Sequence, residues 1–112
     1  MITTHVLDTS IGRPAVGVTV VLERSEGGSG WSALGHGETD ADGRLRTLLA
    51  ADAKLTPGRY RLVFDTRKYF ESRNVRNFYP TVLVIFEVTP GDEHLHVPLL
   101  LSPYGYTTYR GS

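Results

Sequence analysis

The stretch YRLVF at residues 60–64 decides the fold class. Successive side chains of a β-strand project to opposite faces, so Tyr60, Leu62 and Phe64 share one face. Arg61 and Val63 take the other face. One apolar face beside one mixed face is typical of a strand that is half buried in a β-sandwich.

Other short segments rich in β-branched and aromatic residues lie on both sides of this strand, separated by clusters of Gly, Pro, Asp and Ser. This pattern favours an all-β fold over a helical one. The expected strands cover residues 2–7, 17–22, 30–35, 43–47, 58–64, 81–88 and 94–101.

One helix is expected, over residues 66–75, because this segment loses the alternation and contains neither Gly nor Pro. Asp65 or Thr66 is suited to cap its N-terminus. Tyr69 and Phe70 would then cover an edge or a face of a sheet. Residues 103–109 are aromatic and strand-like, so we expect the C-terminal tail to be held in place rather than frayed.

The composition predicts a single domain over residues 1–112, since 40% hydrophobic content suffices for one core. Twelve basic and twelve acidic residues give a formal net charge of zero. A nucleic-acid partner and an anionic membrane are therefore not expected. The chain has no cysteine, which excludes disulfides, thiolate nucleophiles, iron–sulfur clusters and cysteine-based zinc sites.

The longest apolar run, residues 82–86, is far shorter than the roughly 20 residues that cross a bilayer. The first residues have neither a basic stretch nor an apolar stretch of the secretory type. The chain also lacks a peroxisomal Ser-Lys-Leu ending. These features predict a cytoplasmic protein without a membrane partner.

The histidines are His5, His36, His94 and His96, and an isolated histidine is more often structural than catalytic. His94 and His96 stand two apart in an expected strand, so their rings share a face. Two such imidazoles can transfer protons, or can bind a metal if a third ligand joins them. The sequence leaves open whether His5 lies in the core or in a cleft.

The segment DADG at residues 40–43 resembles the start of a calcium loop, but it lacks the later glutamate and the flanking helices. A tight turn is the better interpretation. Arg44 follows this turn. It is either a solvated strand residue or a guanidinium that binds a substrate oxygen or carboxylate.

Two segments resemble the signatures of the transthyretin superfamily. The first is HVLD at residues 5–8, followed by GRPA at 12–15 and VTV at 18–20; the second is LHVPLLLSPYGYT at 95–107. Four features are similar to its enzyme branch, the 5-hydroxyisourate hydrolases: His5, Arg44, His96 and the terminal YRGS at 109–112. Leu95 stands where the signature usually has Tyr, which we interpret as a packing change.

The resemblance implies an all-β, transthyretin-like fold, an eight-stranded antiparallel β-sandwich with one short helix. It also implies a homotetramer whose active sites lie in clefts between dimers, with no metal and no cofactor. The expected activity opens the ring of 5-hydroxyisourate to 2-oxo-4-hydroxy-4-carboxy-5-ureidoimidazoline in urate catabolism. The role of His94 stays open.

In this interpretation, His5 and His96 transfer protons, and His5 also contacts the substrate. Arg44 binds the substrate and its developing negative charge. Tyr109 and Arg110 contact the substrate, and Ser112, with its terminal carboxylate, orients an imidazole or a water. Two alternatives remain: a transthyretin-like carrier of small ligands without catalysis, and a structural sandwich domain of a larger assembly. Neither would require His5, Arg44, His96 and the tail together.

Overall fold

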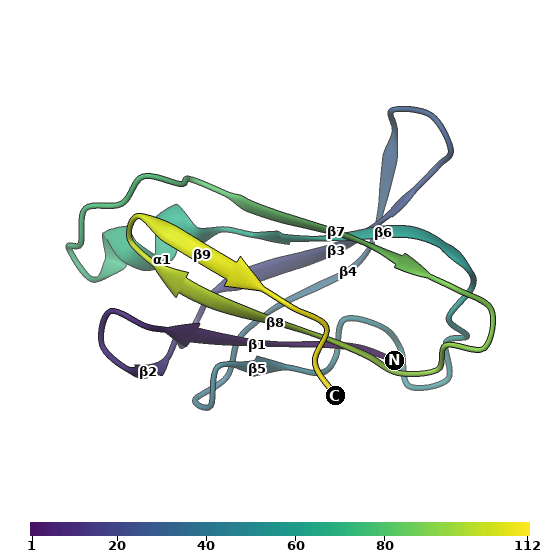
Figure 1. Ribbon diagram of the computed structural model, residues 1–112, viewed down its shortest axis with the longest axis horizontal. Coiled ribbons are helices and arrows are strands. Elements are labelled where there is room, and N and C mark those ends of the chain that lie inside the picture. Colours follow the sequence, from purple (N-terminus) through teal and green to yellow (C-terminus); the bar gives the residue numbers. More distant parts are fainter.

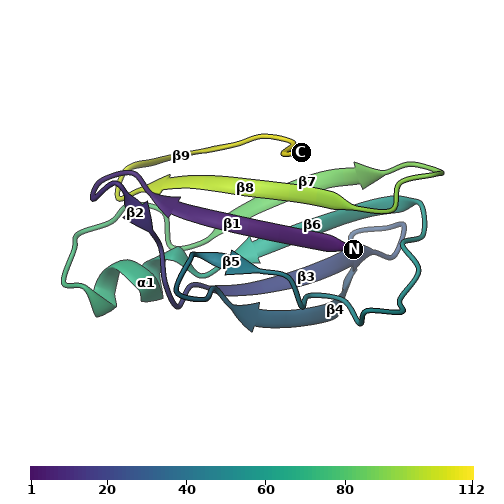
Figure 2. The same ribbon diagram turned by 90° about the horizontal axis from the view of Figure 1, so that it is seen from below.

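Two β-sheets packed face to face make up the computed structural model, which describes residues 1–112 (Figure 1). One short helix covers one end of the two layers (Figure 2). The prediction of a sandwich with one helix is thereby confirmed. The elements are β1 (Ile2–Asp8), β2 (Arg13–Pro14), β3 (Thr19–Ser25), β4 (Trp31–Glu38), β5 (Arg44–Leu45), β6 (Gly58–Phe64), α1 (Thr66–Ser72), β7 (Val82–Val88), β8 (Leu95–Ser102) and β9 (Gly105–Thr108).

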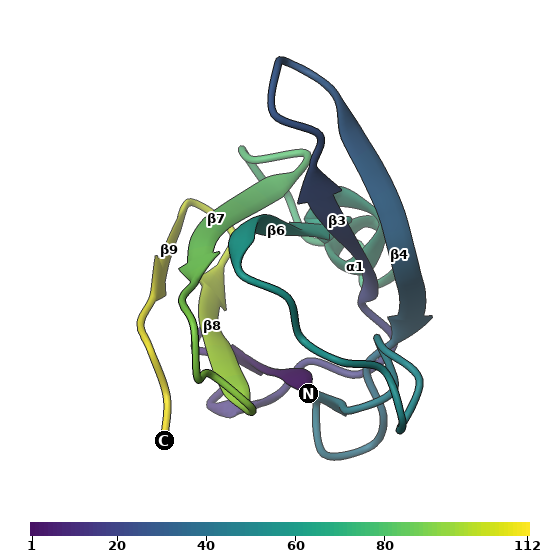
Figure 3. The same ribbon diagram turned by 90° about the vertical axis from the view of Figure 1, so that its right-hand side faces the viewer.

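The five-stranded sheet has the order β2-β1-β8-β9, with β5 also paired to β1, and the four-stranded sheet has the order β4-β3-β6-β7. The inward-facing residues of both sheets form one hydrophobic cluster, in the space that Figure 3 shows enclosed between the layers. Tyr60, Leu62 and Phe64 all belong to this cluster, as the alternation in residues 60–64 predicted. The outer face of the five-stranded sheet does not belong to this cluster and carries polar side chains, among them His5, Arg44 and His96.

The strand pairing differs from the expectation in one respect, because β1 and β8 run parallel in an otherwise antiparallel arrangement. Consecutive strands joined by a tight turn must be antiparallel, but β1 and β8 lie near opposite ends of the chain. Their relative direction is therefore set by packing. This pairing runs from Ile2 opposite Leu95 to Asp8 opposite Leu101.

The strand count and most element boundaries also differ. Nine strands are present, two of them, β2 and β5, have only two residues, and the helix expected over 66–75 ends at Ser72. The strand expected at 43–47 shrinks to β5, because the chain then turns to bury Leu48. Gly35 permits this approach, since a Cβ there would lie 1.9 Å from the Leu48 carbonyl oxygen. The strand expected at 30–35 extends to Glu38, which pairs with Thr19.

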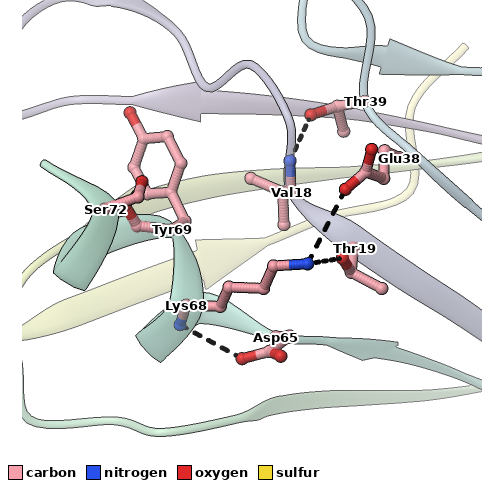
Figure 4. A network of polar contacts seen from close by, with 8 residues as sticks. All are labelled: Val18, Thr19, Glu38, Thr39, Asp65, Lys68, Tyr69 and Ser72. Carbon is pink, nitrogen blue, oxygen red and sulfur yellow. Dashed lines mark hydrogen bonds and ion pairs between the residues drawn. The ribbon is translucent and has the colours of Figure 1, made fainter.

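The helix α1 begins as expected at the N-cap Asp65, whose carboxylate accepts the backbone N–H of Lys68. The ammonium of Lys68 reaches Glu38 on β4 at 3.8 Å (Figure 4). On its buried side, the hydroxyl of Tyr69 donates to Asp8 at 2.7 Å, and burial together with this carboxylate raises the pKa of Tyr69. The helix is thus fixed to both sheets.

No helix of the structure has the length and apolar character needed to cross a membrane.

Candidate functional site

A polar cleft lies on the outer face of the five-stranded sheet. In the ladders, Thr3 on β1 stands opposite His96 on β8, and His5 on β1 stands opposite Arg44 on β5. Directly paired residues share a face, so these four side chains lie on one surface. The cleft has a volume of about 180 Å³, and its lining includes Met1, Thr3, Arg44, Arg46, His94, His96 and Ser112.

The turn before β5 places Arg44. One carboxylate oxygen of Asp40 accepts the backbone N–H groups of Asp42 at 2.8 Å and Arg44 at 2.9 Å. These hydrogen bonds lower the pKa of Asp40. Gly43 has a φ of +75°, and a Cβ there would lie 2.5 Å from the Val6 carbonyl oxygen. The prediction of a tight turn is confirmed, and the Asp40 carboxylate accepts hydrogen bonds from the backbone of the turn itself.

His5 lies half buried on the outer face, so it is not a core histidine. Its Nε2 is 2.8 Å from the carbonyl oxygen of Asp42 in the same turn. A carbonyl only accepts hydrogen bonds, so Nε2 carries the proton and Nδ1 is the free acceptor of the neutral ring. His5 stands beside Arg44 but is not among the residues that line the cleft of this single chain.

His96 lies at the centre of the site, with its Nδ1 2.8 Å from the hydroxyl of Thr3. Burial lowers the pKa of His96, and the positive charges of Arg44, His5 and His94 lower it further, while a backbone hydrogen bond with Thr3 opposes them. The neutral imidazole is therefore favoured. His94 and His96 share a face, as predicted, since Nε2 of His94 lies 3.4 Å from the same hydroxyl.

The C-terminal tail packs directly on His96. The backbone N–H of Gly111 donates to the carbonyl of His96 at 2.8 Å. A Cβ at Gly111 would lie 2.6 Å from Cδ2 of His96 and 3.0 Å from Cγ of Pro98, so a larger residue would displace the imidazole or the tail. The tail is held in place as predicted, and it brings Ser112 into the cleft.

Tyr109 and Arg110 do not reach this cleft within one chain. They line a second, more apolar cavity of about 230 Å³, which also contacts β7 and His96. The guanidinium of Arg110 pairs with Asp92 at 3.5 Å. His96 therefore borders both cavities, with Arg44 and Ser112 on one side and Tyr109 and Arg110 on the other.

The metal alternative for His94 and His96 lacks a third ligand in this chain. No group of three His, Cys, Asp or Glu side chains lies close enough together to hold a metal ion. The charged groups that lower the pKa of His96, namely Arg44, His5 and His94, are all basic. The arrangement therefore suits proton transfer by a neutral imidazole beside a guanidinium that stabilises negative charge.

Two residues of the site, Thr3 and Gly111, could not be predicted from the sequence. Thr3 shares a face with His5 by alternation, but its position opposite His96 depends on the pairing of distant strands. Gly111 belongs to the YRGS tail, yet its contact with the His96 ring follows only from the path of the tail. Strand alternation could place Thr3 on the same face as His5, but nothing in the sequence indicated the contact of Gly111 with His96.

Comparisons with known proteins agree with this architecture. A family model described as "HIUase/Transthyretin family" matches residues 2–111. The 5-hydroxyisourate hydrolase of Salmonella dublin is 48% identical over 112 residues, covering 100% of this chain and 81% of that protein.

Two solved structures share the fold over almost the whole chain. Klebsiella pneumoniae 5-hydroxyisourate hydrolase matches with a TM-score of 0.85 and 39% identity, covering 99% of this chain and 92% of that one. Sea bream transthyretin in complex with thyroxine matches with a TM-score of 0.90 and 32% identity, covering 98% and 93%. One fold thus serves a hydrolase and a thyroxine-binding protein, so the function must be decided by the site.

Proposed function

The chain belongs to the HIUase/transthyretin family, and from this membership and its site we infer that it is a 5-hydroxyisourate hydrolase of urate catabolism. The observation that carries the assignment of residues is the meeting of His96, Arg44 and Ser112 in one cleft, with His5 beside Arg44. The carrier alternative is less favoured, because identity is higher to the Klebsiella hydrolase than to the sea bream transthyretin.

The reaction is the opening of the six-membered ring by water. The water oxygen bonds to a ring carbonyl carbon, the adjacent C–N bond breaks, and the leaving nitrogen takes up a proton. We assign the two proton transfers to His5 and His96. Arg44 binds the substrate and the negative charge that develops on the carbonyl oxygen, because its planar guanidinium suits a flat, oxygen-rich ring. Ser112 orients an imidazole or the attacking water.

Tyr109 and Arg110 would meet the substrate in a site completed by a neighbouring subunit of a homotetramer. Their exposure supports this proposal, since the Tyr109 residue is 55% exposed and the Arg110 side chain 72% exposed. Leu83 and Ile85 on the nearby edge strand β7 are exposed apolar residues that an interface would cover. A cytoplasmic location also stays a prediction.

The test of the function is direct. Freshly generated 5-hydroxyisourate should lose its ultraviolet absorbance faster when the purified protein is added, in proportion to the protein concentration. His36→Ala serves as a control, because His36 is an exposed histidine on β4 in the other sheet. A decay rate equal to that of the spontaneous reaction would refute the assignment.

The pH dependence should reflect the environment of His96. Burial and the charges of Arg44, His5 and His94 disfavour its imidazolium, so the ring gives up its proton at a lower pH than a free histidine. The acidic limb of kcat/KM should therefore lie below pH 6.5, the ordinary pKa of histidine. A titration of the His96 ring by NMR checks the same quantity, and an inflection at or above pH 6.5 would contradict the prediction.

Activity should not depend on a metal ion. Imidazoles and a guanidinium supply the proton transfers and the charge stabilisation, and His94 and His96 have no third ligand in the chain. Dialysis against a strong chelator should leave turnover unchanged. Stoichiometric zinc in the purified protein, with activity lost on chelation and restored by zinc, would instead support a metal site.

The protein should be a tetramer, and its activity should require assembly. Light scattering gives the mass in solution, and turnover measured over a dilution series shows whether activity falls as subunits separate. We expect specific activity to decline with the fraction of tetramer, because Tyr109 and Arg110 of one chain do not face its own cleft. A monomer with full activity would contradict this prediction.

A further inference from the structure

Thr3 lies between the two histidine rings of the cleft. It stands on β1 directly opposite His96 and is only 5% exposed. Its hydroxyl oxygen is 2.8 Å from Nδ1 of His96 and 3.4 Å from Nε2 of His94. The hydrogen-bond partner of Nδ1 of His96 is thus a neutral hydroxyl and not a carboxylate.

The His96 ring is fixed on two edges. Its Nδ1 meets the Thr3 hydroxyl, and its Cδ2 lies against the backbone of Gly111. A half-turn of the ring would exchange these two atoms, which would remove the hydrogen bond and place Nδ1 against Gly111. The ring therefore keeps one orientation, and the remaining question is which nitrogen carries the proton.

The hydrogens of this cluster can be counted. A neutral imidazole has one N–H, and a hydroxyl donates one hydrogen bond while it accepts up to two. If the His96 proton is on Nδ1, the Thr3 oxygen accepts it and the Thr3 hydrogen is free to go to Nε2 of His94. If the proton is on Nε2, Thr3 must donate to His96, and His96 has no free nitrogen to accept a proton from water.

We propose that Thr3 is a positioning residue, whose hydroxyl accepts the Nδ1–H of His96, donates to Nε2 of His94 and so leaves Nε2 of His96 free as the proton acceptor. The proposal rests on the hydrolase function inferred above. When the water oxygen bonds to the carbonyl carbon, the water proton moves to Nε2 of His96. Thr3 stays a neutral alcohol throughout, and its oxygen stabilises the imidazolium by accepting from Nδ1.

The test compares three variants. Thr3→Val keeps the shape and removes the hydroxyl, and Thr3→Ser keeps the hydroxyl. Thr66→Val is the matched control, because Thr66 is also buried, its hydroxyl donates to the Tyr79 carbonyl at 2.7 Å, and it lines neither cavity. Both valine variants lose one buried hydroxyl, but only one of these hydroxyls contacts an imidazole.

We expect Thr3→Val to lower kcat by about 10- to 100-fold, the effect typical of a lost hydrogen-bond partner behind a functional histidine, with a smaller change in KM. Thr3→Ser should restore most of this loss. Thr66→Val should lower the melting temperature but keep the wild-type kcat in the folded protein. Equal kcat values for Thr3→Val and the wild type, or equal losses of kcat in the two valine variants, would overturn the proposal.

A second readout does not depend on turnover. Nitrogen NMR of the wild-type protein with labelled histidines, above the His96 pKa, should show the His96 proton on Nδ1, and Thr3→Val should shift it toward Nε2. A wild-type His96 protonated on Nε2 would overturn the proposal even if Thr3→Val failed to fold. Failure of the wild type to hydrolyse 5-hydroxyisourate would instead refute the function, which separates the two outcomes.

Discussion

Replacing His96 by alanine should lower kcat/KM for 5-hydroxyisourate by about 10²–10⁴-fold, the usual cost of removing a positioned acid or base. His96 is the one histidine that borders both cavities, and its ring meets Thr3. His5→Ala and Arg44→Ala should also lower kcat/KM, His5 through the second proton transfer and Arg44 through the charge on the carbonyl oxygen.

Thermal unfolding of the same variants distinguishes catalysis from structure. His96 is half buried and does not belong to the hydrophobic cluster, so we expect a melting temperature close to that of the wild type. His36→Ala, in the other sheet, should change neither quantity. Near-normal turnover in His96→Ala or His5→Ala would refute the role assigned to that residue. A loss of stability that matched the loss of activity would favour a structural role.

Deleting residues 109–112 should abolish most of the activity at little cost to the fold. The deletion removes a few hydrogen bonds at the sheet margin, among them the one from Gly111 to the His96 carbonyl, so the free energy of unfolding should fall by about 1–2 kcal/mol. The activity should fall far more, because the deletion removes Ser112 from the cleft and uncovers the His96 ring.

A single substitution separates these contributions. Gly111→Ala places a methyl group 2.6 Å from Cδ2 of His96, too close for an ordinary contact, so it should reduce kcat/KM while the rest of the tail is kept. Gly105→Ala is the matched control on β9, because a Cβ there would meet only the Ser102 hydroxyl oxygen at 3.7 Å, an ordinary contact. Native rates in both the truncated chain and Gly111→Ala would show that the tail has no part in the site.

The fold was predictable because its strands are short and strongly patterned. The inward faces of residues 60–64, the Asp65 cap and the tight turn before Arg44 all follow from local rules of alternation, capping and backbone geometry. The partner of each strand was not predictable in this way. Alternation says which face a side chain takes, but it does not say that Thr3 will stand opposite His96 or that these strands run parallel.

The candidate site was predicted in part for the same reason. His96, Arg44 and Ser112 meet in one cleft, as expected from the resemblance, and His5 stands next to Arg44. Tyr109 and Arg110 were expected at the substrate, but they line the second cavity of the single chain. A second subunit that completes their surroundings is part of the proposal made above.

The parallel pairing of β1 with β8 also has a consequence for how the protein acquires activity after synthesis. Thr3 and His96 are 93 positions apart in the chain, and the ladder between their strands closes a loop of nearly the whole polypeptide. Closing so large a loop carries an entropic cost before any contact repays it, which makes such pairings slow to form. An N-terminal fragment that ends before β8 lacks His96 and the tail, so we expect activity only after most of the chain has left the ribosome.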